Sequence, residues 1–289
     1  MNLRVWMAFL ALCLIWGIPY FFIKKAVVEL SPVWVAWGRL AFGTLLLLPV
    51  AWKRGALRNI GKHRTVIVAF ALAELVGPFY LIALGERWVS SSLAGIMLAA
   101  VPLMVVMIAP LLGVKEHLAP RRLVGLIVGL VGVVALLGLG TLHSAHEWIG
   151  AGCILLATVG YAVGPLIIQR HLTDTDPLGT VAASVAIGTV VLTVPALLTV
   201  PGAWPSSSTV LSVLILGLVC TALGLILFVY VISHAGAARA AVVTYVNPAV
   251  AVLLGVWILG EHFGLGSGVG LLLILIGSWL ATDSRKTAH

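Results

Sequence analysis

Apolar residues run along this chain in long stretches, separated by short segments rich in proline, glycine or charge. A helix needs about 20 apolar residues to cross the roughly 30 Å hydrocarbon core of a bilayer. Each stretch supplies close to that number, so the pattern predicts ten membrane-spanning helices with short connections. Their expected bounds are 5–27, 32–51, 65–84, 91–112, 120–138, 148–168, 178–200, 208–232, 240–259 and 264–282.

The composition also indicates an all-α integral membrane protein. Of the 289 residues, 62% are hydrophobic and 9% are charged, whereas soluble domains carry about a quarter charged residues. The first apolar stretch is too long for a signal peptide and lacks a small-residue cleavage site, so we expect it to be the first span. Three cysteines, Cys13, Cys153 and Cys220, lie inside apolar stretches and do not suggest a disulfide framework.

Positive charge is distributed unevenly over the connections. The net charge is +8, but the Lys and Arg residues lie in short loops between spans, which argues against nucleic-acid binding. Most of the 17 Lys and Arg fall on the side of the membrane that holds the N-terminus, many of them in the loop 53–64. The positive-inside rule then predicts that both termini are cytoplasmic.

The two halves of the chain repeat a pattern at an offset of 145 residues. The matching pairs include Glu116-His117 with Glu261-His262, Pro32 with Pro177, Trp16 with Tyr161, and Gly125 with Gly270. We therefore expect two homologous five-helix repeats, 1–144 and 145–289. Because five is odd, the second repeat is inverted in the membrane, an arrangement typical of secondary transporters.

Four prolines lie inside expected spans at nearly corresponding places in the two halves. Pro19 pairs with Pro165, and Pro102 pairs with Pro248. Matching helix interruptions are a sequence indicator of a transporter binding site, so these four are candidate kink or gating positions. The alternative is that they are ordinary kinks, which neighbouring helices can satisfy.

Two ionisable residues fall well inside spans, Arg39 in the second and Glu74 in the third. Each costs about 2.5–3.5 kcal/mol at a helix centre on insertion scales, so neither should face lipid. One interpretation is a structural ion pair between the two helices. The other is that one or both line a polar cavity and bind substrate, for example the carboxylate and ammonium groups of an amino acid.

A set of amphipathic side chains also lies within the spans, where such groups tend to face the bundle interior. It comprises Trp16, Tyr80, Tyr161, Tyr230, Tyr245 and Asn247. Together they would form a largely apolar cavity with a few hydrogen-bonding groups, as small-molecule sites do. The alternative is simple packing between helices. Gly125 and Gly129 in the fifth span and Gly270 in the tenth instead predict close helix packing, as in a scaffold.

Other chemistry is not indicated. His143 and His146 lie beside Glu147 without a further ligand cluster, so we expect no metal site. No P-loop, GxSxG or HExxH motif occurs, and no catalytic residue or cofactor is expected. No pore loop or charged ring suggests a channel.

The most specific stretch runs from 236 to 264 and reads GAARAAVVTYVNPAVAVLLGVWILGEHFG. With Trp16-Gly17 in the first span, small residues before Pro102 and a Glu closing each half, the chain resembles the EamA-like branch of the drug/metabolite transporter superfamily. The resemblance covers essentially the whole chain. It implies a bundle around a central cavity lined mainly by helices 1, 3, 4, 6, 8 and 9, with helices 5 and 10 outside.

The resemblance also implies alternating-access export of amino acids, related metabolites or toxic cations across the bacterial inner membrane. We expect the partners to be a small-molecule substrate and the lipid bilayer, and the chain to work as a monomer. The alternatives are efflux of cationic drugs, or more remotely a membrane enzyme or structural subunit. We expect Glu261-His262, like Glu116-His117, to form a structural turn that holds an acidic residue at the interface.

Overall fold

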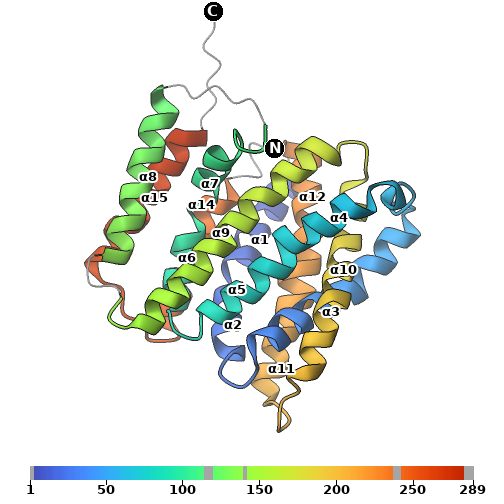
Figure 1. Cartoon of the computed structure of the whole chain (residues 1–289), viewed down its shortest axis with the longest axis horizontal. Coiled ribbons are helices and arrows are strands. Elements are labelled where there is room, and N and C mark those ends of the chain that lie inside the picture. Colours follow the sequence, from blue (N-terminus) through green and yellow to red (C-terminus); the bar gives the residue numbers. More distant parts are fainter. Residues whose placement is uncertain (1–2, 114–119, 139–141, 237–241, 283–289) are drawn as a thin grey trace, which may run out of the picture.

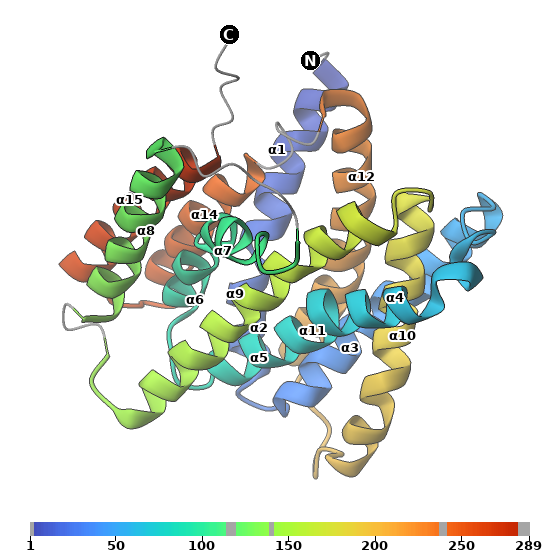
Figure 2. The same cartoon turned by 45° about the horizontal axis from the view of Figure 1, so that its top comes forward.

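The chain folds into a bundle of helices, as Figures 1 and 2 show. The computed structural model describes residues 3–113, 120–138, 142–236 and 242–282. No strand occurs among these residues. Each of the ten expected spans coincides with helical structure, and the all-α prediction is confirmed. The first-half copy of the acidic turn, Glu116-His117, lies outside the described residues.

The first five spans are built from eight α-helices and two shorter segments. The bounds are α1 Leu3–Gly17, α2 Pro19–Ala26, α3 Pro32–Lys53, the 3₁₀ turn η1 Ile60–His63, α4 Arg64–Phe70, the π-helical η2 Ala71–Val76, α5 Gly77–Gly85, α6 Ser91–Leu98, α7 Val101–Ile108 and α8 Pro120–Gly138. The first span thus joins α1 and α2, the third runs from η1 to α5, and the fourth joins α6 and α7.

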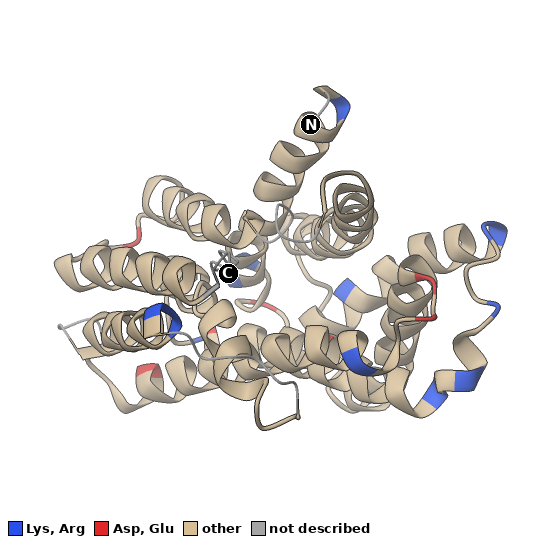
Figure 3. Cartoon of the chain, turned by 90° about the horizontal axis from the view of Figure 1, so that it is seen from above, with Lys and Arg blue, Asp and Glu red and all other residues tan. Residues whose placement is uncertain are grey.

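Among the described residues, the last five spans are built from six α-helices and one π-helical segment. The bounds are α9 Ala145–His171, α10 Pro177–Leu198, α11 Ser207–Leu214, the π-helical η3 Ile215–Leu223, α12 Gly224–Ala235, α14 Val243–Trp257 and α15 Leu265–Thr282. Among the described residues, eight helical stretches are long and apolar enough to cross a membrane, and two shorter apolar helices lie in the ninth and tenth spans. Charged residues are sparse along the helices, as Figure 3 shows.

The four candidate prolines affect their helices differently. Pro19 begins α2 and Pro102 lies in the first turn of α7, so each interrupts its span. Pro165 and Pro248 lie inside α9 and α14, which continue through them. A proline inside a helix removes one backbone donor but need not end the helix when its neighbours support it. Proline interruptions are therefore not paired between the two halves.

A different irregularity is paired. The third span contains the π-helical segment η2, Ala71–Val76, and the eighth contains η3, Ile215–Leu223. Adding the repeat offset of 145 residues to 71 and 76 gives 216 and 221, which fall inside η3. Short π-helical segments are rare and frequently occur at functional sites. The two matching segments therefore make the third and eighth spans candidates for the functional site.

Helices α8 and α15 lie side by side at one edge of the bundle in both views (Figures 1 and 2). A Cβ atom on Gly125 would lie 2.5 Å from the Ala281 nitrogen, and one on Gly270 would lie 2.6 Å from the Leu136 Cβ. These two contacts are related by the repeat offset, since 125 and 136 become 270 and 281. Glycine allows the two backbones to approach closely, as the sequence predicts for a scaffold pair.

A second symmetric contact joins α3 to α10. The hydroxyls of Thr44 and Thr189 lie 2.9 Å apart, and the two residues are separated by 145 positions. Each therefore meets its own counterpart in the other repeat. A contact between equivalent residues is expected on the axis of an approximate two-fold symmetry that relates the two repeats.

Candidate functional site

Arg39 lies on α3 with 7% of its surface exposed. Its Nε donates a hydrogen bond to the Thr221 hydroxyl at 2.9 Å, and its Cζ lies 3.6 Å from the centre of the Phe79 ring. The Thr221 hydroxyl in turn donates to the Leu216 carbonyl at 2.9 Å, five residues earlier in η3. The π-helical segment of the second repeat thus positions the hydroxyl that holds a buried guanidinium of the first repeat.

Glu74 lies in η2, the matching π-helical segment of the first repeat. Its carboxylate packs against Gly164 of α9, where any side chain would collide with it. Its Oε2 atom is buried and has no hydrogen-bond partner among the described residues. A buried polar atom without a partner is costly. The Glu74 carboxyl group is therefore a candidate for binding a ligand.

Arg39 and Glu74 do not form an ion pair. Within the described part of the chain, Arg39 bonds to Thr221 and stacks on Phe79, and the carboxylate of Glu74 faces α9. The structural ion pair considered from the sequence is therefore wrong, because the two groups belong to different packing environments. Tyr161 lies within electrostatic range of both charges.

Aromatic side chains surround this pair of charges. Tyr80 and Tyr161 are half-buried and pack on one apolar cluster that includes Phe79 and Leu75. Tyr161 also packs on the larger apolar cluster of the bundle. The structure thus gathers four of the predicted residues, Arg39, Glu74, Tyr80 and Tyr161, from the second, third and sixth spans.

Trp16, on the first span, packs against η3. The Trp16 indole donates to the Cys220 carbonyl at 3.2 Å and its ring lies 4.8 Å from that of Phe228. The Gly224 N–H bonds to the carbonyls of Val219 and Thr221. The carbonyl of Cys220, which lies between these two residues in the sequence, accepts the hydrogen bond from Trp16 instead. Trp16 and Arg39 therefore bond to adjacent residues of the same π-helical segment.

The side-chain amide of Asn247 joins two helices when its nitrogen faces the neighbouring carbonyls. It then donates to Cys13 of α1 at 3.3 Å and to Val243 of α14 at 3.0 Å. This role is structural.

Tyr230 stacks on His234, with ring centres 4.2 Å apart, and Tyr245 lies in the first turn of α14.

A polar network that the sequence did not predict lies where α2, the α5–α6 turn and the α14–α15 turn meet. Lys24 donates to the carbonyls of Glu86 at 2.7 Å and of Val89 at 2.8 Å. Glu261 accepts from the Ser91 N–H at 2.7 Å, the Ser92 N–H at 2.9 Å and the Ser92 hydroxyl at 2.5 Å. The carboxylate therefore caps the N-terminus of α6, where a helix favours negative charge.

This geometry supports the structural interpretation of the Glu261-His262 turn. Gly260 has φ +67°, which lets the chain reverse after α14, and the Glu261 N–H bonds to the Gly255 carbonyl at 3.0 Å. Glycine at 255 is required because a side chain there would collide with the Glu261 carboxylate. The partner of this acidic residue, 169 residues away in sequence, could not be identified from the local pattern.

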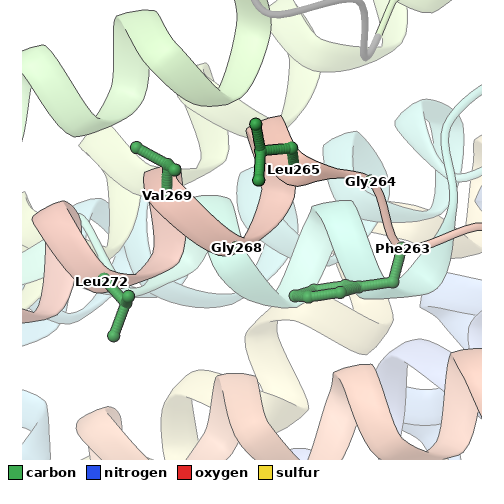
Figure 4. Close-up of a pocket in the computed structure, with 6 residues that line it drawn as sticks. All are labelled: Phe263, Gly264, Leu265, Gly268, Val269 and Leu272. Atoms are coloured by element: carbon green, nitrogen blue, oxygen red, sulfur yellow. The ribbon is translucent and has the colours of Figure 1, made fainter.

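Two surface depressions lie away from the candidate residues. One is lined by Trp52, Gly55, Leu57 and Arg58 beyond the end of α3. The other lies beside the start of α15, where Phe263 and Leu272 point to the same side (Figure 4). The second is lined entirely by apolar side chains and glycine, as expected for a lipid-facing groove. Among the described residues no group of three His, Cys, Asp or Glu could hold a metal ion.

Comparison with known proteins gives a consistent result over the whole chain. The model of the EamA-like transporter family matches twice, at residues 4–138 and 148–282. The uncharacterized inner membrane transporter YedA of Escherichia coli (strain K12) is 31% identical, over 94% of this chain and 91% of YedA. An uncharacterized transporter of Archaeoglobus fulgidus is 26% identical, over 99% of each chain. A solved crystal structure with 18% identity covers 98% of this chain and 97% of its own, with a TM-score of 0.66.

Proposed function

Because this chain belongs to the EamA-like transporter family, within the drug/metabolite transporter superfamily, we propose that it is a secondary transporter that exports small metabolites. Amino acids, including aromatic ones, are the leading substrate class, and the mechanism is alternating access around a central cavity between the repeats. A transporter also accounts for the absence of a convergent nucleophile and base in the sequence.

The observation that carries the amino-acid proposal is the presence of two ionisable groups inside the bundle that do not pair with each other. Arg39 and Glu74 lie on neighbouring spans, do not pair with each other, and flank Tyr161. An amino acid presents a carboxylate and an ammonium group that could satisfy both. The Phe79 ring against the Arg39 guanidinium and the nearby Tyr80 and Tyr161 would supply an apolar surface for the side chain.

One observation favours the alternative, efflux of a cationic drug. Glu74 has no basic partner among the described residues and lies beside aromatic side chains. A hydrophobic cation would neutralise it without using Arg39. The two proposals therefore differ in what they require of the arginine.

Variants at these two positions distinguish the proposals. We expect Arg39→Gln to abolish uptake of amino acids into proteoliposomes, because the substrate carboxylate loses its partner, and Glu74→Gln to abolish it as well. Arg87→Gln, on the exposed turn after α5, serves as the control. Transport of a cationic dye that survives in Arg39→Gln but not in Glu74→Gln would support the drug efflux alternative instead.

Orientation and boundaries follow from the same proposal. We place both termini in the cytoplasm of the bacterial cell, because the basic loop 53–64 would then face inward. The relative YedA is named an inner membrane transporter, which supports this membrane. The repeats divide near residue 144, and the monomer contains the complete site. Labelling of single cysteines introduced into the loops, with a membrane-impermeant reagent, tests the orientation.

A further inference from the structure

Glu86 is a buried carboxylate at the end of the third span, immediately after α5. Its side chain has 0% of its surface exposed. Neither carboxylate oxygen has a hydrogen-bond partner among the described residues. Its backbone carbonyl is engaged by Lys24, whose ammonium is shared with the Val89 carbonyl. The ammonium group therefore lies close to Glu86 but is directed at backbone oxygens.

The surroundings of Glu86 contain charges of both signs. The charged and titratable groups on the neighbouring elements are Tyr20 and Lys24 on α2, Arg39 on α3, His146 packed on Trp88 from α9, and Glu261 after α14. Burial raises the pKa of Glu86 well above its usual range; the positive Lys24 and Arg39 oppose this shift and the negative Glu261 adds to it.

The two neighbouring carboxylates differ in how they are satisfied. Glu261 accepts three hydrogen bonds at the N-terminus of α6. Glu86 accepts none from the described residues. Glu86 therefore lacks the hydrogen bonds that would stabilise its ionised form, which makes it the group that holds a proton.

The burial of Glu86 depends on a contact between the two halves of the chain. Glu261 belongs to the second half, and the α6 N-terminus that it caps follows Glu86 by only five residues, at Ser91. Alternating access requires contacts between the repeats to break at one end of the bundle while they form at the other. When this contact opens, water reaches the α5–α6 turn and the cost of ionising Glu86 falls.

We propose that Glu86 is a proton-binding site of the transporter, which holds a proton while Glu261 caps α6 and releases it when this contact opens. The proton binds to one carboxylate oxygen and leaves to water, and no other bond changes. This inference rests on the proposed transport function. It locates coupling to a proton at the end of the third span, separate from the candidate substrate group around Glu74.

The transport test compares Glu86→Gln with Glu29→Gln, an exposed carboxylate in the α2–α3 connection that bonds to Ser206. Uptake of a transported substrate is measured in proteoliposomes with and without a pH gradient. We expect the ratio of the two rates to fall to one in Glu86→Gln and to stay at the wild-type value in Glu29→Gln. A wild-type ratio in Glu86→Gln would overturn the proposal.

A second measurement does not depend on transport. Infrared spectra of the purified wild type and of Glu86→Gln are recorded across neutral pH and subtracted, which cancels the band of any other protonated carboxyl such as Glu74. The difference should contain a protonated carboxyl band that belongs to Glu86, and a difference spectrum without such a band would overturn the proposal. If no substrate is transported by the wild type, the proposed function fails, whereas the infrared comparison still decides whether Glu86 holds a proton.

Discussion

Replacement of Glu261 by alanine removes the cap of α6 and provides the sharpest test of the packing account. The first backbone donors of a helix have no partner within it. In α6 they are satisfied from outside: Ser91 and Ser92 donate to Glu261, and Leu93 donates to the Ser90 hydroxyl at 3.1 Å. Ser91 is fully buried and Ser92 is 3% exposed, so water does not replace the lost acceptor easily.

The magnitude follows from the groups left without partners. A buried donor that loses its acceptor costs about 1–3 kcal/mol, and loss of a helix cap costs about 0.5–2 kcal/mol. Glu261→Ala orphans two N–H groups and one hydroxyl, and the turn can relax partly toward water. We expect a loss of about 3 kcal/mol for Glu261→Ala, and about 1 kcal/mol for Ser92→Ala, which removes only the hydroxyl.

The assay is thermal unfolding of the purified protein in detergent, together with the yield of folded protein and the affinity for substrate. A loss of about 3 kcal/mol should lower the unfolding midpoint by about 6 °C or more in a chain of this size. Folded yield should fall more than substrate affinity. His262→Ala, at an exposed neighbouring position, is the matched control. An unfolding midpoint for Glu261→Ala equal to that of His262→Ala would refute the capping role.

Three further predictions follow from contacts elsewhere in the bundle. Gly277→Val should prevent close packing of α15 on the α8 backbone and lower folded yield, whereas Gly268→Ala, whose Cβ would lie 3.6 Å from its nearest neighbour, should not. Gly164→Ala should displace the Glu74 carboxylate and reduce substrate affinity in a binding assay while the unfolding midpoint falls less than in Gly277→Val. Because the native state binds a proton at Glu86 above the usual carboxyl pKa of 4.5, wild-type stability should decrease as pH rises above that value. Unfolding midpoints of Glu86→Gln should fall less over the same range; an identical decrease would contradict this.

The spans were predictable because the bilayer leaves few alternatives. A segment that crosses it must be apolar and must satisfy its own backbone, so apolar runs bounded by Pro32 or Pro177 could only be helices. The glycines of α8 and α15 were predictable for a related reason, since close backbone approach requires a small residue and leaves a visible spacing. Both features depend on short stretches of sequence and can therefore be recognised without knowledge of the fold.

The candidate site was predictable only in part. Arg39 and Glu74 were conspicuous as charges inside apolar spans, but their separation depends on Thr221, Phe79 and Gly164, which carry no local signal. The π-helical segments arise when backbone hydrogen bonds shift by one residue, a change that leaves composition and periodicity almost unaltered. Only the fold shows that two of them occupy matching places.

Glu86 escaped the sequence analysis because it lies just beyond an apolar run, where a charged residue is expected to be solvated. Its burial results from α2 and the α14–α15 turn, which approach it from distant parts of the chain. Lys24 lies likewise near the end of a span, and the structure directs its ammonium at two backbone carbonyls. Burial of residues in connections is decided by tertiary packing.

The most direct test of the central claim is counterflow of labelled amino acids in proteoliposomes that contain the purified wild-type protein. Unlabelled amino acid is loaded inside, and entry of the labelled form is measured for each member of a panel, including aromatic ones. The account predicts saturable entry of at least one amino acid that empty liposomes do not show. Absence of saturable entry for every amino acid, with counterflow of a hydrophobic cation instead, would contradict it.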